Sequence, residues 1–240
     1  MHPVYVHIKK ELSPFYAEEE ASAMAKWISS DILHLSTLEL YTGKDMNFST
    51  KEWEELEDIL RRLKQREPLQ YILQEASFCG MSFHVEQGVL IPRPETEELV
   101  EWIVSDYREA GQVRILDIGT GSGCIPVSLA QLLPEAQVSS CDVSAEALRI
   151  AAMNVKRYGD KVTLFCADIL KEELPECQVD VLVSNPPYIT ESERTDMEAN
   201  VLDWEPELAL FVPDSDPLRF YRRIARKGLD WLSEGGAFVF

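Results

Sequence analysis

The sequence predicts an α/β protein in which a small helical bundle precedes a mostly parallel sheet with helices on both faces. From residue 113 onward, β-forming stretches alternate with helix-forming stretches, and this order is typical of parallel strands joined by crossover helices. A glycine-rich turn, residues 119–123, directly follows the first of these strands. The first 66 residues instead carry apolar side chains at helical spacing. Together these observations predict two units of different class.

Residues 1–67 are predicted to form the helical bundle. Ser13 before Pro14 predicts a helix cap followed by a proline in the first turn. Ser49, with Glu52 three residues later, predicts a capping box at the start of another helix. The apolar stripe that follows this box is interpreted as core: Trp53, Leu56, Ile59, Leu60 and Leu63.

Residues 68–92 are predicted to form a β-hairpin connector. One strand should carry alternating apolar residues up to Val85, residues 86–88 should turn, and Val89 and Ile91 should lie on the return strand. The remaining part, residues 93–240, is expected to begin with a helix at Pro94. Strands are then predicted at 113–118, 137–143, 161–169, 179–184 and 236–240, with intervening helices at 124–133, 144–159 and 216–232.

Composition narrows the class of protein. The chain has 23 basic and 42 acidic side chains, a net charge of −19, which argues against a nucleic-acid partner. No apolar run reaches the ~18 residues of a membrane span, and the N-terminus lacks the apolar core of a signal peptide. The 5 cysteines form no C-x-x-C pair, and the 4 histidines lack metal-ligand spacing. We therefore expect a cytoplasmic protein with reduced thiols, no metal and no membrane contact.

The stretch "LDIGTGSG" carries the first candidate site. It places Gly119, Gly121 and Gly123 between a strand and a helix, where backbone N–H groups can approach a ligand closely. Asp142 ends the next strand 19 positions after Gly123, where a carboxylate can bind ribose hydroxyls. The G-x-G-x-G spacing differs from the G-x-G-x-x-G of dinucleotide sites. A nicotinamide site and a purely structural tight turn stay open as alternatives.

With Asp117 in front, the pattern D-x-G-x-G-x-G resembles the S-adenosylmethionine site of class I methyltransferases, which are Rossmann-like. The resemblance implies S-adenosyl-L-methionine as cofactor and S-adenosyl-L-homocysteine as product, with no metal. Asp168 is placed to meet the adenine amino group, or is a helix cap, and Ile169 could cover the ring although an aromatic residue is often found there. The expected cofactor-binding residues are Asp117, Gly119, Thr120, Gly121, Ser122, Gly123, Asp142, Asp168, Ile169 and Asn185.

The second candidate site is the corner "NPPY", residues 185–188, directly after a strand. Prolines cannot donate to a sheet, so the strand must stop there. The Asn185 side-chain oxygen and the Pro186 carbonyl can each accept one N–H of a planar NH₂ group, and Tyr188 can stack on it. Asn185, Pro186 and Tyr188 are therefore the catalytic candidates, and Pro187 joins them in binding substrate. An ordinary proline-rich turn is the structural alternative.

This corner resembles the signature of methyltransferases that act on adenine N6, guanine N2 or glutamine amides. Three further stretches, "REPLQYI", "IPRPETE" and "WEPELAL", resemble the HemK-type release factor glutamine methyltransferases. The resemblance covers the chain from about residue 15 to its end. It implies methyl transfer to N5 of the glutamine in the Gly-Gly-Gln loop of a peptide-chain release factor, which the helical bundle would dock. That family's sheet usually gains an antiparallel pair after the fifth strand, so we expect those strands to be missing here.

Two rival functions stay open. A nucleic-acid amino-methyltransferase, acting on adenine N6 or guanine N2, would need a basic track for the strand. The clearest basic run, 221–227, is interpreted as the solvated face of a helix, opposite Leu218, Tyr221 and Leu229. A catalytically dead binding module is the second rival, and the intact corner argues against it. The acidic segment 189–217 is expected to be a mobile substrate loop.

Overall fold

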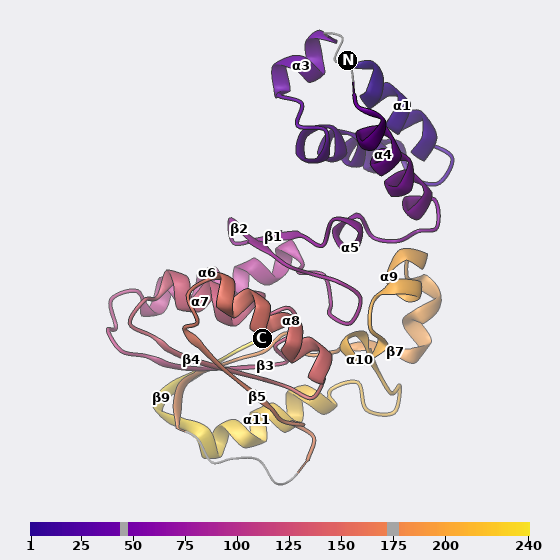
Figure 1. The fold of residues 1–240 in the computed structure, drawn as a ribbon. Helices are drawn as coiled ribbons and strands as arrows, with labels where there is room; N and C mark the ends of the chain where they lie inside the picture. Colours follow the sequence, from indigo (N-terminus) through magenta and orange to yellow (C-terminus); the bar gives the residue numbers. More distant parts are fainter. Residues whose placement is uncertain (44–47, 172–177) are drawn as a thin grey trace. The chain divides into compact units, whose positions relative to one another are not determined.

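The computed structural model describes residues 1–43, 48–171 and 178–240, which form two compact units, Met1–Ile72 and Leu73–Phe240 (Figure 1). The first unit is helical and the second contains the sheet. The finer boundaries at residues 67 and 92 stay predictions. Cys177, one of the cysteines expected to be reduced, lies outside the described residues.

The first unit is built from helices whose ends carry recognisable capping signals. The Ser49–Glu52 capping box is confirmed, and Gly43 ends the preceding helix in the left-handed conformation at φ 66°. The side chains of Leu56, Ile59, Leu60 and Leu63 are buried as predicted, whereas Trp53 is exposed. The elements are α1 Pro3–Leu12, α2 Glu18–Trp27, the π-helical turn η1 Ile28–Ile32, α3 Thr37–Thr42, α4 Thr50–Leu63 and α5 Leu69–Leu73.

The predicted helix start at Ser13 and Pro14 is wrong. Ser13 instead closes α1, because its N–H and its hydroxyl both donate to the Lys9 carbonyl oxygen, at 2.9 and 2.7 Å. The helix starts earlier, at Pro3, where the His2 ring nitrogen Nδ1 accepts a hydrogen bond from Val4 N. A proline in the first turn is thus present, but one helix earlier than predicted.

The predicted hairpin register is also wrong. The hairpin pairs β1 Ala76–Phe78 with β2 Met81–Phe83, around a turn at Cys79 and Gly80. Both turn residues have positive φ, 49° and 69°, which is the geometry of a type I′ turn matching the twist of the two strands. The segment after β2 therefore does not return as a strand, and residues 88–90 line the pocket described below.

The second unit contains the predicted parallel sheet, with strand order β5-β4-β3-β6-β9 (Figure 1). Every neighbouring pair in this sheet is parallel, as the alternation of strands and helices predicted. The last strand begins before residue 236, directly after its helix. The elements are α6 Pro94–Tyr107, β3 Arg114–Ile118, α7 Cys124–Leu132, β4 Gln137–Asp142, α8 Ala145–Arg157, β5 Val162–Cys166, β6 Val179–Val183, α11 Arg219–Trp231 and β9 Leu232–Val239.

Helices cover both faces of this sheet, and alternate strand residues serve the two faces. On one face Ile115 and Val181 pack with apolar side chains of α6, α7 and α8. On the other face the adjacent residues Leu116 and Leu182 pack with Ile224 of α11. Figure 1 shows these helix layers on opposite sides of the sheet. The period of two along each strand therefore produces a three-layer unit.

The segment after the corner is more regular than the expected loop. It contains β7 Ile189–Thr190, the 3₁₀ helix η2 Glu191–Asp196, α9 Ala199–Trp204, α10 Glu207–Leu210 and β8 Phe211–Val212. A capping box, Thr190 with Glu193, begins the first of these turns, and β7 pairs with β8 in parallel. Across the described part of the chain, no helix is long and apolar enough to cross a membrane.

Candidate active site

A pocket opens at the carboxyl ends of the parallel strands, where open α/β sheets bind ligands. It is bordered by the turns that follow β3, β4, β5 and β6. Eight of the predicted site residues line it: Gly119, Gly121, Asp142, Asp168, Ile169, Asn185, Pro186 and Pro187. The other five do not line it: Asp117, Thr120, Ser122, Gly123 and Tyr188.

The glycine turn is held against the neighbouring strand by its backbone. The N–H groups of Gly119 and Thr120 donate to the Cys141 carbonyl oxygen at 2.8 and 3.0 Å. Gly119 and Gly121 have φ of +88° and +53°, and open space surrounds the position that a Cβ would take on either residue. Two bare glycines therefore leave room in the pocket for a ligand to approach the backbone.

Gly123 serves packing instead. A Cβ on this residue would lie 3.2 Å from the Cβ of Ala151 in α8, which is tighter than an ordinary contact. Its φ of +82° also disfavours a side chain. Gly123 therefore lets α7 and α8 approach each other behind the turn, a role separate from contacting a ligand.

Asp142, at the end of β4, is fixed by two backbone donors. Gly121 N donates to Oδ2 at 3.0 Å, and Ser144 N donates to Oδ1 at 2.9 Å. Each carboxylate oxygen can accept a further hydrogen bond. The side chain is thus oriented in the pocket wall with capacity left for hydroxyl donors such as those of a ribose.

Asp117 lies beneath the turn and is fully buried. Ser140 Oγ donates to its Oδ2 at 2.5 Å, and Thr120 joins the same hydroxyl. Its Oδ1 has no hydrogen-bond partner in the described residues. The pKa of Asp117 is raised to about 7, mainly by burial, against the lowering effect of the Ser140 hydrogen bond and with a further upward contribution from the nearby charge of Asp142. An unpartnered buried carboxylate oxygen next to the pocket fits a cationic ligand group.

Asp168 both caps a turn and lines the pocket. Its Oδ1 accepts a hydrogen bond from Leu170 N at 3.0 Å, and the adjacent residue Ile169 is buried. Arg223 of α11 holds this turn, because its Nε donates to the Ile169 carbonyl oxygen at 2.8 Å and its guanidinium also contacts the Lys171 carbonyl. At least one arginine of the basic run 221–227 is therefore used within the fold.

The face predicted for α11 is wrong. Leu229 is 83% exposed, and the buried residues are Ile224, Gly228 and Trp231. Gly228 permits this packing, because a Cβ there would clash with the Phe238 ring of β9 at 2.0 Å. The pattern of apolar residues does not reveal such a close approach of helix and strand, because glycine belongs to neither the apolar nor the polar face of a helix.

The corner after β6 is tied down on both sides. The Ser184 hydroxyl donates to the Ile118 carbonyl oxygen at 2.6 Å, and Ser184 N donates to Val239 O at 3.1 Å. The Asn185 side-chain nitrogen Nδ2 donates to the hydroxyl of Thr96 at 3.0 Å. Tyr188, next to the lining residue Pro187, is 58% exposed. The corner therefore presents the Asn185 amide and the prolines to the pocket, with the tyrosine ring outside its lining.

Three further groups of lining residues were not predicted from the sequence. They come from the segment after β2, from α10 with its preceding proline, and from α11: Gly88, Val89 and Leu90; Pro206, Leu208 and Ala209; Phe220 and Ile224. The stretch "IPRPETE" directly follows the first group and "WEPELAL" contains the second, so both were usable signals. Glu205 links these two stretches. Its Oε1 accepts a hydrogen bond from Arg93 Nη2 at 2.5 Å, and its Oε2 accepts one from Ile91 N at 3.1 Å.

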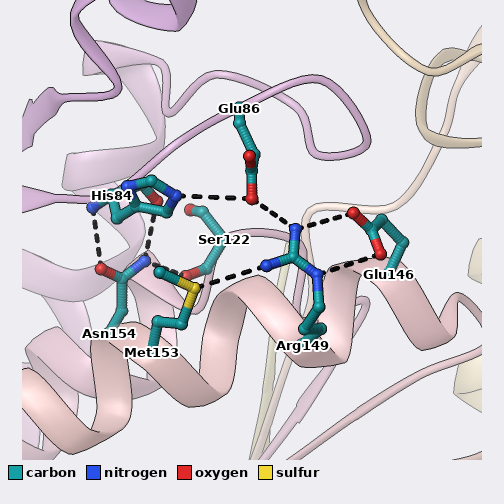
Figure 2. Close-up of polar contacts among 7 residues, drawn as sticks. All are labelled: His84, Glu86, Ser122, Glu146, Arg149, Met153 and Asn154. Atoms are coloured by element: carbon teal, nitrogen blue, oxygen red, sulfur yellow. Dashed lines mark hydrogen bonds and ion pairs between the residues drawn. The ribbon is translucent and has the colours of Figure 1, made fainter.

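Figure 2 shows how α8 holds the segment that forms this pocket wall. Asn154 is fully buried and exchanges hydrogen bonds with both backbone groups of His84, at 2.8 and 2.9 Å, while its Nδ2 also donates to Ser122 O at 2.8 Å. Nearer the pocket, Arg149 pairs with Glu86 and with Glu146. One side chain, Asn154, thus connects the wall segment to the glycine turn.

Comparisons with known proteins agree with this arrangement. Residues 5–73 match the family described as PrmC N-terminal domain, and residues 96–203 match the methyltransferase small domain. The crystal structure of the hMettl16 catalytic domain shares the fold, with a TM-score of 0.50 at 19% identity, over 77% of this chain and 65% of that chain. The predicted fold class, a Rossmann-like methyltransferase after a helical N-terminal domain, is confirmed.

Relatives with curated names are much closer. A release factor glutamine methyltransferase of Bacteroides thetaiotaomicron is 50% identical over 100% of this chain and 86% of the relative. That of Flavobacterium psychrophilum is 40% identical over 95% of this chain and 81% of the relative. Identity at this level, over at least 95% of this chain and more than four-fifths of each relative, covers the helical unit, the glycine turn and the corner together. The chain therefore belongs to the release factor glutamine methyltransferase family.

Proposed function

We propose that this chain transfers a methyl group from S-adenosylmethionine to the side-chain amide nitrogen N5 of a glutamine in a peptide-chain release factor, the glutamine of its Gly-Gly-Gln loop. The names of its relatives support this substrate. The observation that carries the proposal is that the glycine turn and the Asn185 corner line one pocket. A cofactor on the turn would therefore face an amide held at the corner.

The residues present fit S-adenosylmethionine. The backbone at Gly119 and Gly121 would take its amino acid end, with the buried Asp117 carboxylate on the side of the ammonium group. Asp142 would hold the ribose hydroxyls, and Asp168 and Ile169 would border the adenine. When bound, S-adenosylmethionine supplies an electrophilic methyl group on its sulfonium. In the described part of the chain, no group of three or more metal-binding side chains is arranged around an ion site.

The corner would supply the acceptors that an amide nitrogen needs. Such a nitrogen is a weak nucleophile because its lone pair is delocalised, so orientation has to contribute much of the rate. The Asn185 Oδ1 and the Pro186 carbonyl would each accept one N–H, aiming the nitrogen and favouring the positive charge that develops on it. Orientation is worth roughly 7–11 kcal/mol in the best intramolecular cases, and each preorganised group about 3–4 kcal/mol. Pro187 and Tyr188 would flank the glutamine side chain.

The partner is then a protein, without direct nucleic-acid contact. The net charge of −19 opposes binding to a phosphate backbone, and release factors act with the ribosome in the cytoplasm, where we place this enzyme. The helical unit, Met1–Ile72, would dock the release factor. This leaves the second unit to hold the cofactor and the glutamine.

Labelled S-adenosylmethionine tests the proposal. The protein is mixed with the cofactor and, separately, with release factor, transfer RNA, ribosomal RNA and DNA. We expect label on the release factor alone. Label on nucleic acid without label on the release factor would favour an amino-methyltransferase of bases, and no transfer to any of the four would favour a binding module without activity.

The Asn185→Ala variant tests the role of the corner. Removing the side-chain acceptor should abolish transfer, while S-adenosylhomocysteine binding measured by calorimetry stays within a few-fold of wild type, because the glycine turn and Asp142 are untouched. Turnover retained near the wild-type rate would refute the role assigned to Asn185.

A further inference from the structure

The carboxamide of Asn185 has two chemically different ends, and the one that faces the substrate decides whether the corner can work. Its oxygen accepts hydrogen bonds, whereas its nitrogen only donates. A glutamine NH₂ group also donates, so a nitrogen turned toward it would place donor against donor. The amide is planar and the two orientations fill the same space, so packing alone does not choose between them.

Thr96 makes the contact that holds the observed orientation. A threonine hydroxyl can donate or accept, and here it is the acceptor. The Asn185 Nδ2 donates to the Thr96 hydroxyl oxygen at 3.0 Å, across 89 positions of sequence. Thr96 is 7% exposed, and Asn185 is half-buried, so water has little access to this hydrogen bond. Nδ2 is thereby directed at α6 and Oδ1 is left for the pocket that Asn185 lines.

The position of Thr96 is supported by an ion pair in which the carboxylate is buried and the arginine is about a third exposed. Thr96 lies in the first turn of α6, where its N–H donates to the Arg93 carbonyl at 3.0 Å. Arg93 and the backbone of Ile91 both bind the carboxylate of Glu205, whose side chain is only 2% exposed. The start of α6 is thus fixed to the segment that follows the corner, and the hydroxyl has a fixed place.

We propose that Thr96 is a positioning residue, which orients the Asn185 carboxamide so that Oδ1 faces the substrate amide. The inference rests on the proposed function for the identity of that amide. It gives a chemical task to the threonine of "IPRPETE", a residue outside the pocket lining. It also explains selectivity for an NH₂ donor, because an oriented oxygen would repel the carboxylate of a glutamate in the same place.

The matched pair Thr96→Val and Thr96→Ser tests the hydroxyl. Valine keeps the branched shape and removes the acceptor, whereas serine keeps the acceptor and removes a methyl group. We expect kcat on release factor to fall roughly 10- to 100-fold in Thr96→Val, because the amide loses its hydrogen bond and populates both orientations. KM and S-adenosylhomocysteine binding should change less than about twofold, and Thr96→Ser should restore kcat to near wild type.

A second readout does not require activity. In ¹⁵N NMR spectra of the whole chain, the Asn185 side-chain NH₂ signals are identified by their loss in Asn185→Ala. They should shift and exchange faster with water in Thr96→Val and stay in place in Thr96→Ser. Circular dichroism checks the fold, and Thr96→Ala replaces the valine variant if that variant does not fold.

The outcomes separate the two claims. Absence of transfer by the wild-type chain defeats the proposed function, and the NMR comparison then still decides the orientation of Asn185. An unchanged kcat in Thr96→Val, an equal loss in Thr96→Ser, or unmoved NH₂ signals in Thr96→Val would each overturn the inference.

Discussion

Replacing Asn154 by alanine should loosen one wall of the cofactor pocket. Asn154 is fully buried in α8, and its carboxamide makes three hydrogen bonds, two with the backbone of His84 and one with the Ser122 carbonyl (Figure 2). It is therefore the point at which the segment before Gly88 and the glycine turn are held together. Alanine removes all three hydrogen bonds and leaves the backbone groups that made them without this partner inside the protein.

The magnitude follows from these contacts. Three hydrogen bonds at about 1 kcal/mol each make a loss of roughly 3 kcal/mol in the free energy of unfolding. The better helix propensity of alanine recovers about 0.5 kcal/mol, which leaves a net loss of about 2.5 kcal/mol. For a unit of this size that corresponds to a melting temperature about 5–10 °C lower. Arg149, also drawn in Figure 2, should matter less, because its ion pairs lie at the surface.

Scanning calorimetry and hydrogen exchange provide the assay. Met153→Ala is the matched control, since this neighbour in α8 is exposed and its replacement should cost about 0.5 kcal/mol or less. In Asn154→Ala, backbone amides of residues 84–90 should exchange faster than in the control. A melting temperature equal to that of Met153→Ala, with unchanged exchange over 84–90, would refute the structural role of Asn154.

Two further predictions concern buried carboxylates. Burial raises the pKa of Asp117 to about 7, so the folded state binds a proton more tightly than the unfolded chain does, and stability should fall as pH rises toward 7. In urea unfolding of the ligand-free protein between pH 5 and 7, the free energy of unfolding of wild type should fall relative to that of Asp117→Asn, by at most about 1.4 kcal/mol per pH unit. If the free energies of unfolding of the two proteins changed in parallel with pH, this prediction would be contradicted. Glu205→Gln should lower the free energy of unfolding by roughly 2–3 kcal/mol. This is less than the loss expected on breaking a fully buried ion pair, because Arg93 is about a third exposed. Equal denaturant midpoints for Glu205→Gln and wild type would count against that ion pair.

The sequence predicted the sheet and both motifs of the site, because these depend on local signals. Runs of β-forming residues alternating with helical stretches identified the strands, and glycines or prolines at their carboxyl ends identified the turn and the corner. The parallel order of the strands then placed Gly119 and Gly121 in one pocket with residues 185–187. The capping box at Ser49 also depends on a local signal and was also predicted from the sequence.

What the sequence did not predict depends on unusual backbone conformations or on contacts between distant residues. The hairpin register was missed because the alternation of Met81, Phe83 and Val85 continues past the strand, while the decisive Cys79–Gly80 turn needs positive φ at a cysteine. The contact of Thr96 with Asn185 and that of Arg93 with Glu205 join positions far apart in the chain. Asp117 was expected to face the cofactor, and only the structure shows that it lies beneath the turn.

The position of the transferred methyl group tests the proposed function most directly. Release factor incubated with the wild-type chain and S-adenosylmethionine is digested, and its peptides are sequenced by mass spectrometry, with the Asn185→Ala chain in parallel. We expect one added methyl group on the side chain of the Gly-Gly-Gln glutamine with wild type and none with the variant. A methyl group on another residue, or an unmodified release factor beside methylated RNA or DNA, would contradict the proposed function.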